Sequence, residues 1–334
     1  MNGPSERRLN ILLVRVSSLG DVLHNLPMVA DLLRQHPDAN VDWVVEEGYV
    51  SLVRLNLRVR RIIPFALRRW RKSLGKPATR AEIRTFLRVL REEQYDYVFD
   101  TQGLLKTGII MGAARLKKGG ARVGLANGSE GSGYEGVSRI FHTRSIALDP
   151  RTHAVARGRL VAAAAMGYSV ASAPDFGLPG PDTASRPAWM PPGDYAVFFH
   201  GTARDAKKWA PSNWIATGHA LAPMAVLLAW GSPAEKAEAE ALAASLPNAR
   251  VLPRLSMDEA VTLARNAALA IGVDTGLTHI AAAFLRPTVE LYCDSPKWKT
   301  EGNWSDRIIN LGDKGAPPSA AEAIAAAMRL LGRS

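Results

Sequence analysis

The sequence has 334 residues, of which 47% are hydrophobic and 22% charged, and its formal net charge is +11. This length and composition are typical of a globular protein with two domains, and no apolar run is long enough to span a membrane. The single cysteine, Cys293, excludes an internal disulfide framework and favours a reducing compartment, so we expect a cytoplasmic protein.

The first half of the chain alternates short apolar runs with amphipathic stretches, a pattern typical of parallel βαβ units. We therefore predict one α/β domain over residues 1–172. Its predicted strands are 9–16, 41–45, 61–64, 95–100 and 122–125, and its predicted helices include 21–35, 79–93 and 104–116.

The first predicted strand runs into the turn VRVSSLGDVLHNLP (14–27), which opens a helix. Ligands of such sheets bind beyond the carboxyl ends of the strands, so the small residues Ser18 and Gly20 are expected to face a ligand. One glycine is too few for the dinucleotide motif G-x-G-x-x-G. Asp21 stands at the helix start, where a carboxylate either caps the helix or serves as a general base. Position alone favours the cap.

The window 54–91 is strongly basic, with 13 Lys and Arg residues against one acid, Glu82. Such a segment repels itself unless an anion offsets the charge, which indicates an anionic partner for this half. Nucleic acid, anionic lipid and an acidic small substrate remain open at this point, and so does an ordinary solvated basic face.

Residues 173–194 are rich in proline and lack periodicity, which predicts a linker. A second α/β domain is predicted over 195–317, and a final helix over 318–334, with Ser319 and Glu322 forming a capping box. We expect this helix to pack back on the first domain. The second domain's predicted strands are 195–200, 225–230, 249–252, 269–274 and 288–293, with helices at 211–221, 233–245, 256–267 and 277–285.

Two turns of the second domain carry candidate ligand-binding residues. In FFHGTARDAKKWAPSNW (198–214), Thr202, Lys207 and backbone N–H groups at a strand end form a possible phosphate clamp, although a solvated surface loop has the same composition. In LAIGVDTGLTHIAAAF (269–284), a strand ends at Asp274 and a helix opens at once. Its amino terminus would bind a diphosphate through Thr275, Gly276 and nearby His279. The alternative is a capping aspartate and a packed imidazole.

Metal-ligand spacings such as H-x-x-x-H, C-x-x-C and D-x-D are absent from the sequence, and so is a G-x-S-x-G nucleophile elbow. We therefore expect no metal and no serine nucleophile.

Together these turns resemble the ADP-heptose:lipopolysaccharide heptosyltransferases of glycosyltransferase family 9. The similar segments occur in family order over roughly residues 9–310: VSSLGDVLHNLP, WVVEEGY, RRWRK, DTQGLLK, HGTARDAKKW, WGSP-x-E and GVDTGLTHIAAA. The resemblance implies a GT-B fold, in which two Rossmann-like, doubly wound domains face a central cleft. WVVEEGY and RRWRK are similar to the members that add the first heptose to Kdo.

The resemblance assigns roles to individual residues. It implies that Asp21 is the catalytic base. It implies donor contacts by Thr202, Lys207, Glu235, Asp274, Thr275, Gly276 and His279. For the acceptor, bound by the first domain, it implies contacts by Ser18, Gly20, Arg68, Arg69, Trp70, Arg71, Lys72 and Gln102.

The implied reaction is inverting transfer of L-glycero-D-manno-heptose from ADP-L-glycero-D-manno-heptose to Kdo of Kdo2–lipid A, in lipopolysaccharide inner-core biosynthesis. It needs no metal or other cofactor, because lysine and the helix dipole stabilise the leaving diphosphate. The protein is then expected to be peripheral on the cytoplasmic face of the inner membrane, against an anionic membrane surface, with no nucleic-acid partner.

The sequence departs from the family pattern in LYCDSPKWKTEGNW (291–304), where Cys293 replaces a glycine, and at Ala203, where a second threonine can occur. These differences concern the contacts to the heptose. Three alternatives stay open: transfer to an already heptosylated core, a sugar-nucleotide epimerase, and a non-catalytic binder of sugar nucleotides or nucleic acid.

Overall fold

The computed structural model describes residues 8–182 and 186–333, and the chain divides into two compact units, Met1–Gly177 and Leu178–Ser334. The boundary lies inside the predicted linker 173–194. Residues 183–185 of that linker, residues 1–7 of the predicted first domain and Ser334 of the predicted last helix lie outside the described residues.

The first unit contains a parallel six-stranded sheet with the order β3-β2-β1-β4-β5-β6. This order reverses between β1 and β4, the topological switch point of a doubly wound sheet. Helices cover both faces, which is why the side chains from Ile11 to Val14 in the central strand are all buried and apolar. The strands are β1 (Asn10–Val14), β2 (Asn40–Glu46), β3 (Arg61–Phe65), β4 (Gln94–Asp100), β5 (Arg115–Leu125) and β6 (Arg144–Ile146).

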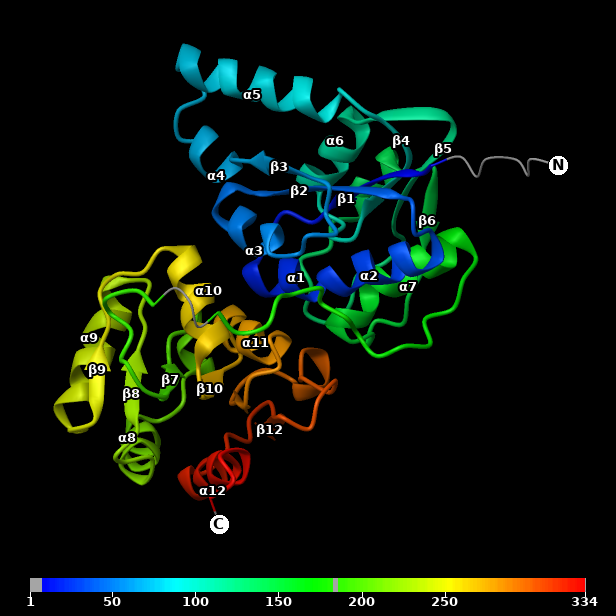
Figure 1. Cartoon of the computed structure of the whole chain (residues 1–334). Helices are drawn as coiled ribbons and strands as arrows, with labels where there is room; N and C mark the ends of the chain where they lie inside the picture. Colours follow the sequence, from blue (N-terminus) through cyan, green and yellow to red (C-terminus); the bar gives the residue numbers. More distant parts are fainter. Residues whose placement is uncertain (1–7, 183–185, 334) are drawn as a thin grey trace. The chain divides into compact units, whose positions relative to one another are not determined.

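The helices of this unit connect the strands in βαβ fashion, and α2 packs beside α7 (Figure 1). The predicted helix 21–35 is two helices, because Asn25 ends α1 and Pro27 stands at the start of α2. The helices are α1 (Leu19–His24), α2 (Leu26–Gln35), α3 (Val50–Arg54), α4 (Leu67–Trp70), α5 (Pro77–Leu90), α6 (Leu105–Ala113) and α7 (Ala154–Met166), with 3-10 turns η1 (Glu47–Tyr49) and η2 (Gly136–Phe141).

The second unit repeats the same plan. Its parallel sheet has the order β12-β11-β10-β7-β8-β9, which reverses between β7 and β10 as the first sheet does between β1 and β4. The strands are β7 (Tyr195–Phe199), β8 (Ala225–Leu228), β9 (Ala249–Val251), β10 (Leu269–Val273), β11 (Thr288–Tyr292) and β12 (Ile308–Gly312). The helices are α8 (Pro211–Ala220), α9 (Pro233–Ala244), α10 (Met257–Asn266), α11 (Gly276–Ala283) and α12 (Ala320–Leu330), with 3-10 turns η3 (Asp205–Lys207) and η4 (Lys297–Lys299).

The apolar face of the last helix packs within its own unit. Ala323, Ala326 and Ala327 of α12 are buried in the core of the second unit, where α12 contacts α8 and β11. These small alanines let the helix lie close to its own sheet, and the expected packing on the first domain stays a prediction. Strands β6 and β12, each at one edge of its sheet, were not predicted.

Candidate active site

The turn after β1 holds Asp21 in a helix-capping arrangement. Its Oδ2 accepts hydrogen bonds from the backbone N–H of Ser18 at 3.0 Å and from the Ser18 hydroxyl at 2.9 Å. Its Oδ1 lies 2.6 Å from a guanidinium nitrogen of Arg15. Burial by itself raises the pKa of Asp21, but Arg15 and the Ser18 hydrogen bonds outweigh it and lower the pKa from 3.8 to about 2. The carboxylate thus caps α1, is ionised at neutral pH, and remains 39% exposed.

The turn after β4 lies beside the turn after β1, because β1 and β4 are neighbours at the switch point. Gln102 accepts a hydrogen bond from the Val16 N–H at 3.0 Å and donates one to the Ser17 hydroxyl at 3.2 Å. The amino group of Lys106 donates to the same hydroxyl at 3.0 Å. The structure therefore brings Gln102 close to the segment that carries Asp21.

Three basic side chains near Asp21 were not predicted as site residues. Burial lowers the pKa of Lys106 and that of Arg157 on α7, and the charge of Arg15 lowers both further. A guanidinium nitrogen of Arg157, Nη2, is buried without a hydrogen-bond partner in the described part of the chain. The sequence signal was a charged residue in an apolar element: Arg15 ends an apolar strand, and Lys106 and Arg157 lie in apolar helices. These three basic side chains make the surroundings of Asp21 electropositive.

In the second unit, Lys207, Asp274 and His279 form one cluster at the switch point. The Lys207 amino group lies 2.5 Å from Asp274 Oδ2, and His279 Nε2 lies 3.0 Å from Asp274 Oδ1. Thr275 is the N-cap of α11 and Gly276 its first residue. The structure thus brings together the turns after β7 and β10, which were predicted as two separate candidate sites.

A buried acid behind this cluster was missed by the sequence analysis. Glu290 of β11 is fully buried, and its Oε1 lies 2.8 Å from His279 Nδ1. Its Oε2 accepts hydrogen bonds from the Tyr292 hydroxyl and from the Gly302 N–H, both at 2.9 Å. The only sequence signal was an acid inside the apolar strand TVELY, since a charged side chain is buried only with a partner.

These contacts decide the charges of the cluster. Burial opposes protonation of His279, but Glu290 and Asp274 outweigh it and raise its pKa from 6.5 to about 10. Burial also disfavours ionised Asp274, but His279 and Lys207 hold its pKa well below the usual range. The cluster at the amino terminus of α11 therefore pairs two basic groups, Lys207 and the His279 imidazolium, with two carboxylates, Asp274 and Glu290.

Thr202 lies in the turn after β7, and Glu235 lies in the first turn of α9, the helix that follows the neighbouring strand β8. The Glu235 carboxylate caps α9, with Oε2 accepting from the N–H groups of Gly231 at 2.7 Å and Ser232 at 3.1 Å. Thr202 is half-buried in the turn that leads to Lys207. Both residues therefore share an edge of the sheet with the Lys207 cluster, and Glu235 has a structural role there.

The predicted basic–aromatic patch 68–72 is only partly a surface patch. Trp70 is buried, its ring contacts Phe65 and Phe86, and its Nε1 donates to Glu82 at 2.8 Å. Trp70 is therefore not part of a surface patch, because its apolar ring completes a core, and its predicted contact to the acceptor stays a prediction. Arg69 pairs with Glu47 at 3.0 Å and Glu82 at 2.7 Å, whereas Arg68, Arg71 and Lys72 are exposed.

The rest of the basic window is also partly neutralised, through ion pairs of Arg58 with Asp175, Arg60 with Asp42 and Arg61 with Glu92. Across residues 8–182 and 186–333, no group of three or more His, Cys, Asp or Glu residues is arranged to hold a metal ion. None of the helices in those ranges is long and apolar enough to cross a membrane.

Comparison with known proteins finds a matching family, similar sequences and similar structures. The model of a protein family described as glycosyltransferase family 9 (heptosyltransferase) matches residues 83–324. Lipopolysaccharide heptosyltransferase 1 of Pseudomonas aeruginosa is 38% identical over 287 residues, which cover 85% of this chain and 78% of the relative. The structure is similar to that of the E. coli heptosyltransferase WaaC with ADP, with a TM-score of 0.80, 30% identity, and coverage of 94% of this chain and 98% of that one. The structure of the same enzyme with ADP-2-deoxy-2-fluoro heptose matches with a TM-score of 0.75, 31% identity, and coverage of 96% and 98%.

Proposed function

The chain belongs to glycosyltransferase family 9, and we propose that it transfers L-glycero-D-manno-heptose from ADP-heptose to Kdo of Kdo2–lipid A. The observation that carries this proposal is the Lys207–Asp274–His279 cluster at the switch point of the second unit. A relative that acts on lipopolysaccharide, 38% identical to this chain, supports the acceptor.

We assign donor binding to the second unit. The leaving group of the reaction is ADP, whose diphosphate gains negative charge as the bond to heptose breaks. The partly exposed amino group of Lys207 and the free N–H groups at the start of α11 can approach that diphosphate, while the buried His279 imidazolium balances the charge of Asp274 beside Lys207. The lysine and the helix amino terminus can take the part that a divalent metal plays in other transferases, so we propose a metal-independent reaction. Activity that is unchanged in EDTA would support this, and loss of activity restored by Mg²⁺ would contradict it.

We assign the proton transfer to Asp21. The Kdo hydroxyl oxygen forms a bond to the anomeric carbon of heptose from the face opposite ADP, ADP leaves with the electron pair of the broken bond, and Asp21 accepts the hydroxyl proton. A carboxylate with a pKa of about 2 is a weak base. It is sufficient because the attacking hydroxyl becomes strongly acidic once its bond to carbon has begun to form. Proton transfer to Asp21 therefore comes late in the displacement, after the bond to the anomeric carbon has begun to form.

We place the acceptor on the first unit. Kdo carries a carboxylate and lipid A carries phosphates, and Lys106, Arg157 and the exposed Arg68 supply cations near the Asp21 turn. Ser18, Gly20 and Gln102 belong to the same two turns. We propose that the protein works as a peripheral protein on the cytoplasmic face of the inner membrane. Vesicle binding that weakens steeply with salt supports this; binding that ignores salt contradicts it.

The decisive experiment measures ADP release from ADP-heptose with and without Kdo2–lipid A. We expect release that depends on the acceptor, and a fall of about 10²- to 10⁴-fold in turnover for Asp21→Asn with ADP affinity unchanged. Glu322→Gln is the matched control, because Glu322 caps α12 with the same contacts to Ser319, at 2.8 and 2.7 Å. The Glu322→Gln variant loses a helix-capping carboxylate but keeps Asp21, so its turnover should equal that of the wild type.

Other outcomes would change the assignment. Full activity in Asp21→Asn would remove the base role. Turnover only with an acceptor that already carries one heptose would make the enzyme a second heptosyltransferase. No turnover with either acceptor, with ADP-heptose still bound, would favour a non-catalytic binder.

A further inference from the structure

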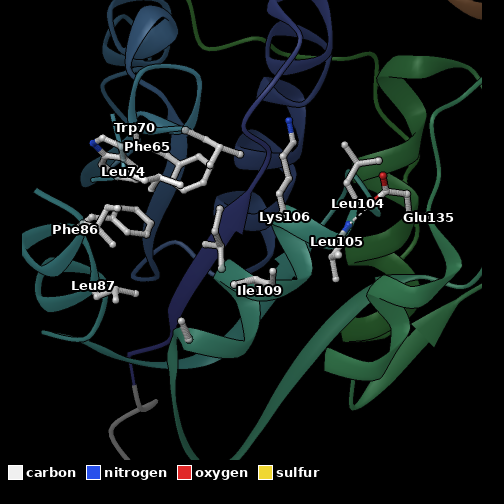
Figure 2. Close-up of a pocket in the computed structure, with 14 residues that line it drawn as sticks. Phe65, Trp70, Leu74, Phe86, Leu87, Leu104, Leu105, Lys106, Ile109 and Glu135 are labelled. Atoms are coloured by element: carbon white, nitrogen blue, oxygen red, sulfur yellow. Dashed lines mark hydrogen bonds between the residues drawn. The ribbon is translucent and has the colours of Figure 1, made fainter. Parts of the chain in front are cut away.

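An apolar pocket of about 670 Å³ opens in the first unit between β3, α4 and α5 on one side and α6 on the other (Figure 2). Its volume lies in the range of small-molecule sites. Its wall is mostly apolar and includes Leu74, Ile83 and Ile109, and its charged residues are Lys106 and Glu135.

The rim of this pocket exposes large apolar side chains to solvent. Leu74 is 54% exposed, Ile109 53% and Leu105 39%. Apolar side chains gathered around an open pocket are unfavourable in water unless something covers them, so they mark a binding site. Trp70, Phe65 and Phe86 support the wall with their mutual ring contacts, which makes it preformed.

The pocket adjoins the turn that carries Asp21. Lys106 lines the pocket (Figure 2). Its amino group donates to the Ser17 hydroxyl at 3.0 Å. Gln102 donates to the same hydroxyl. A molecule whose polar end lies at the Asp21 turn can therefore place an apolar tail in the pocket.

The outer face of the same region is basic. Arg80, Arg84 and Arg88 follow one another at helical spacing along α5 and are exposed, whereas Ile83 and Leu87 on the same helix line the pocket. Arg71 and Lys72, after α4, are also exposed, and no acid among the described residues pairs with them. An amphipathic helix with a basic face is typical of proteins that lie on an anionic lipid surface.

We propose that this pocket seats a fatty acyl chain of the acceptor glycolipid while the basic residues around it face the lipid phosphates. The proposal rests on the proposed function for the identity of the acceptor. A methylene chain needs no hydrogen-bond partner, and the wall offers few. The basic residues outside the pocket complement the negative charge of an anionic lipid. Lys106 contacts both the pocket, where the acyl tail would lie, and the turn where the sugar would react. The pocket therefore gives the enzyme affinity for the lipid portion, separate from its contacts to Kdo.

The first test compares Kdo2–lipid A with the same molecule after removal of its acyl chains. We expect Ile109→Gln to raise KM for the acylated acceptor by about tenfold, because a neutral polar tip replaces apolar contact equivalent to two or more methylene groups. KM for the deacylated acceptor and for ADP-heptose should not change. Ile140→Gln is the matched control: Ile140 is a 72% exposed isoleucine of the same unit that does not line the pocket.

An equal change of KM for both acceptors, or no change for either, would overturn the proposal. A second measurement does not need turnover. An acyl amphiphile that carries bromine on its chain should quench the fluorescence of Trp70 in wild type, and the quenched fraction should disappear in Trp70→Phe. Quenching without heptose transfer would keep the pocket and reject the proposed function. Transfer without quenching would reject the pocket. A third outcome is a wild-type dimer that is lost in Ile109→Gln, together with no quenching by the brominated amphiphile. This outcome would overturn the proposal and assign the pocket to a second copy of the chain.

Discussion

Replacing Glu290 with glutamine removes a buried charge from the second unit and keeps the size of the side chain. In the wild type, Glu290 lies 2.8 Å from His279 Nδ1, and Asp274 lies 3.0 Å from Nε2. In Glu290→Gln the imidazolium keeps one anionic neighbour and the burial that opposes its charge. We therefore expect the pKa of His279 to fall from about 10 towards its ordinary value.

The size of the effect follows from linkage. A pKa raised from 6.5 to about 10 corresponds to roughly 4–5 kcal/mol in favour of the protonated folded state. Because the folded pKa lies above the unfolded one, this stabilisation is complete below pH 6.5 and is lost between pH 6.5 and 10, at about 1.4 kcal/mol per pH unit. Asp274 keeps part of it, so we expect Glu290→Gln to lower the free energy of unfolding by about 2–4 kcal/mol near pH 7.

The assay is denaturant unfolding of wild type and variant from pH 6 to pH 9.5, combined with NMR titration of the His279 ring. The difference in unfolding free energy should narrow as the pH rises, because the wild type loses the stabilisation that the variant already lacks. Tyr292→Phe is the matched control. It removes one hydrogen bond to Glu290 at 2.9 Å but leaves the carboxylate charge, so His279 should stay protonated at pH 8.

Two results would refute this reasoning. One is a stability difference that is independent of pH, which would mean that Glu290 acts by packing alone. The other is a His279 ring that titrates at the same pH in wild type and variant, which would mean that Asp274 alone keeps the His279 ring protonated.

Three further predictions concern other parts of the chain. Arg15→Gln removes the cation that lowers the pKa of Asp21, so burial should raise that pKa and move the acid limb of the kcat–pH profile upward; an unchanged limb would contradict this. Lys207→Met should raise KM for ADP-heptose about tenfold or more and leave KM for the acceptor unchanged, which steady-state kinetics can check. Asp31→Ala removes the only carboxylate that pairs, at 2.6 Å in the wild type, with the buried guanidinium of Arg159 among the described residues, and leaves it hydrogen bonds to Ser172 alone. The free energy of unfolding should fall by about 3–5 kcal/mol, and a loss below 1 kcal/mol would refute the importance of the pair.

Much of the fold and part of the site could be predicted from the sequence. Apolar runs of strand length between amphipathic stretches predicted most of the parallel strands, since both faces of a parallel sheet are buried and read as apolar throughout. Small residues and a carboxylate after a strand predicted the turns at Asp21 and Asp274, because open parallel sheets bind ligands at the carboxyl ends of strands. The family motifs then indicated the role of each turn.

Only the tertiary structure decided which side chains meet. Glu290 reads as one acid in an apolar strand, and its partner His279 is found only when α11 packs against β11. Trp70 reads as part of a basic surface patch, yet its ring is buried because Phe65 of β3 and Phe86 of α5 enclose it. Local pattern determines the type of an element and the face it buries. Distances between segments depend on strand order, and a single sequence does not contain that order as a local signal.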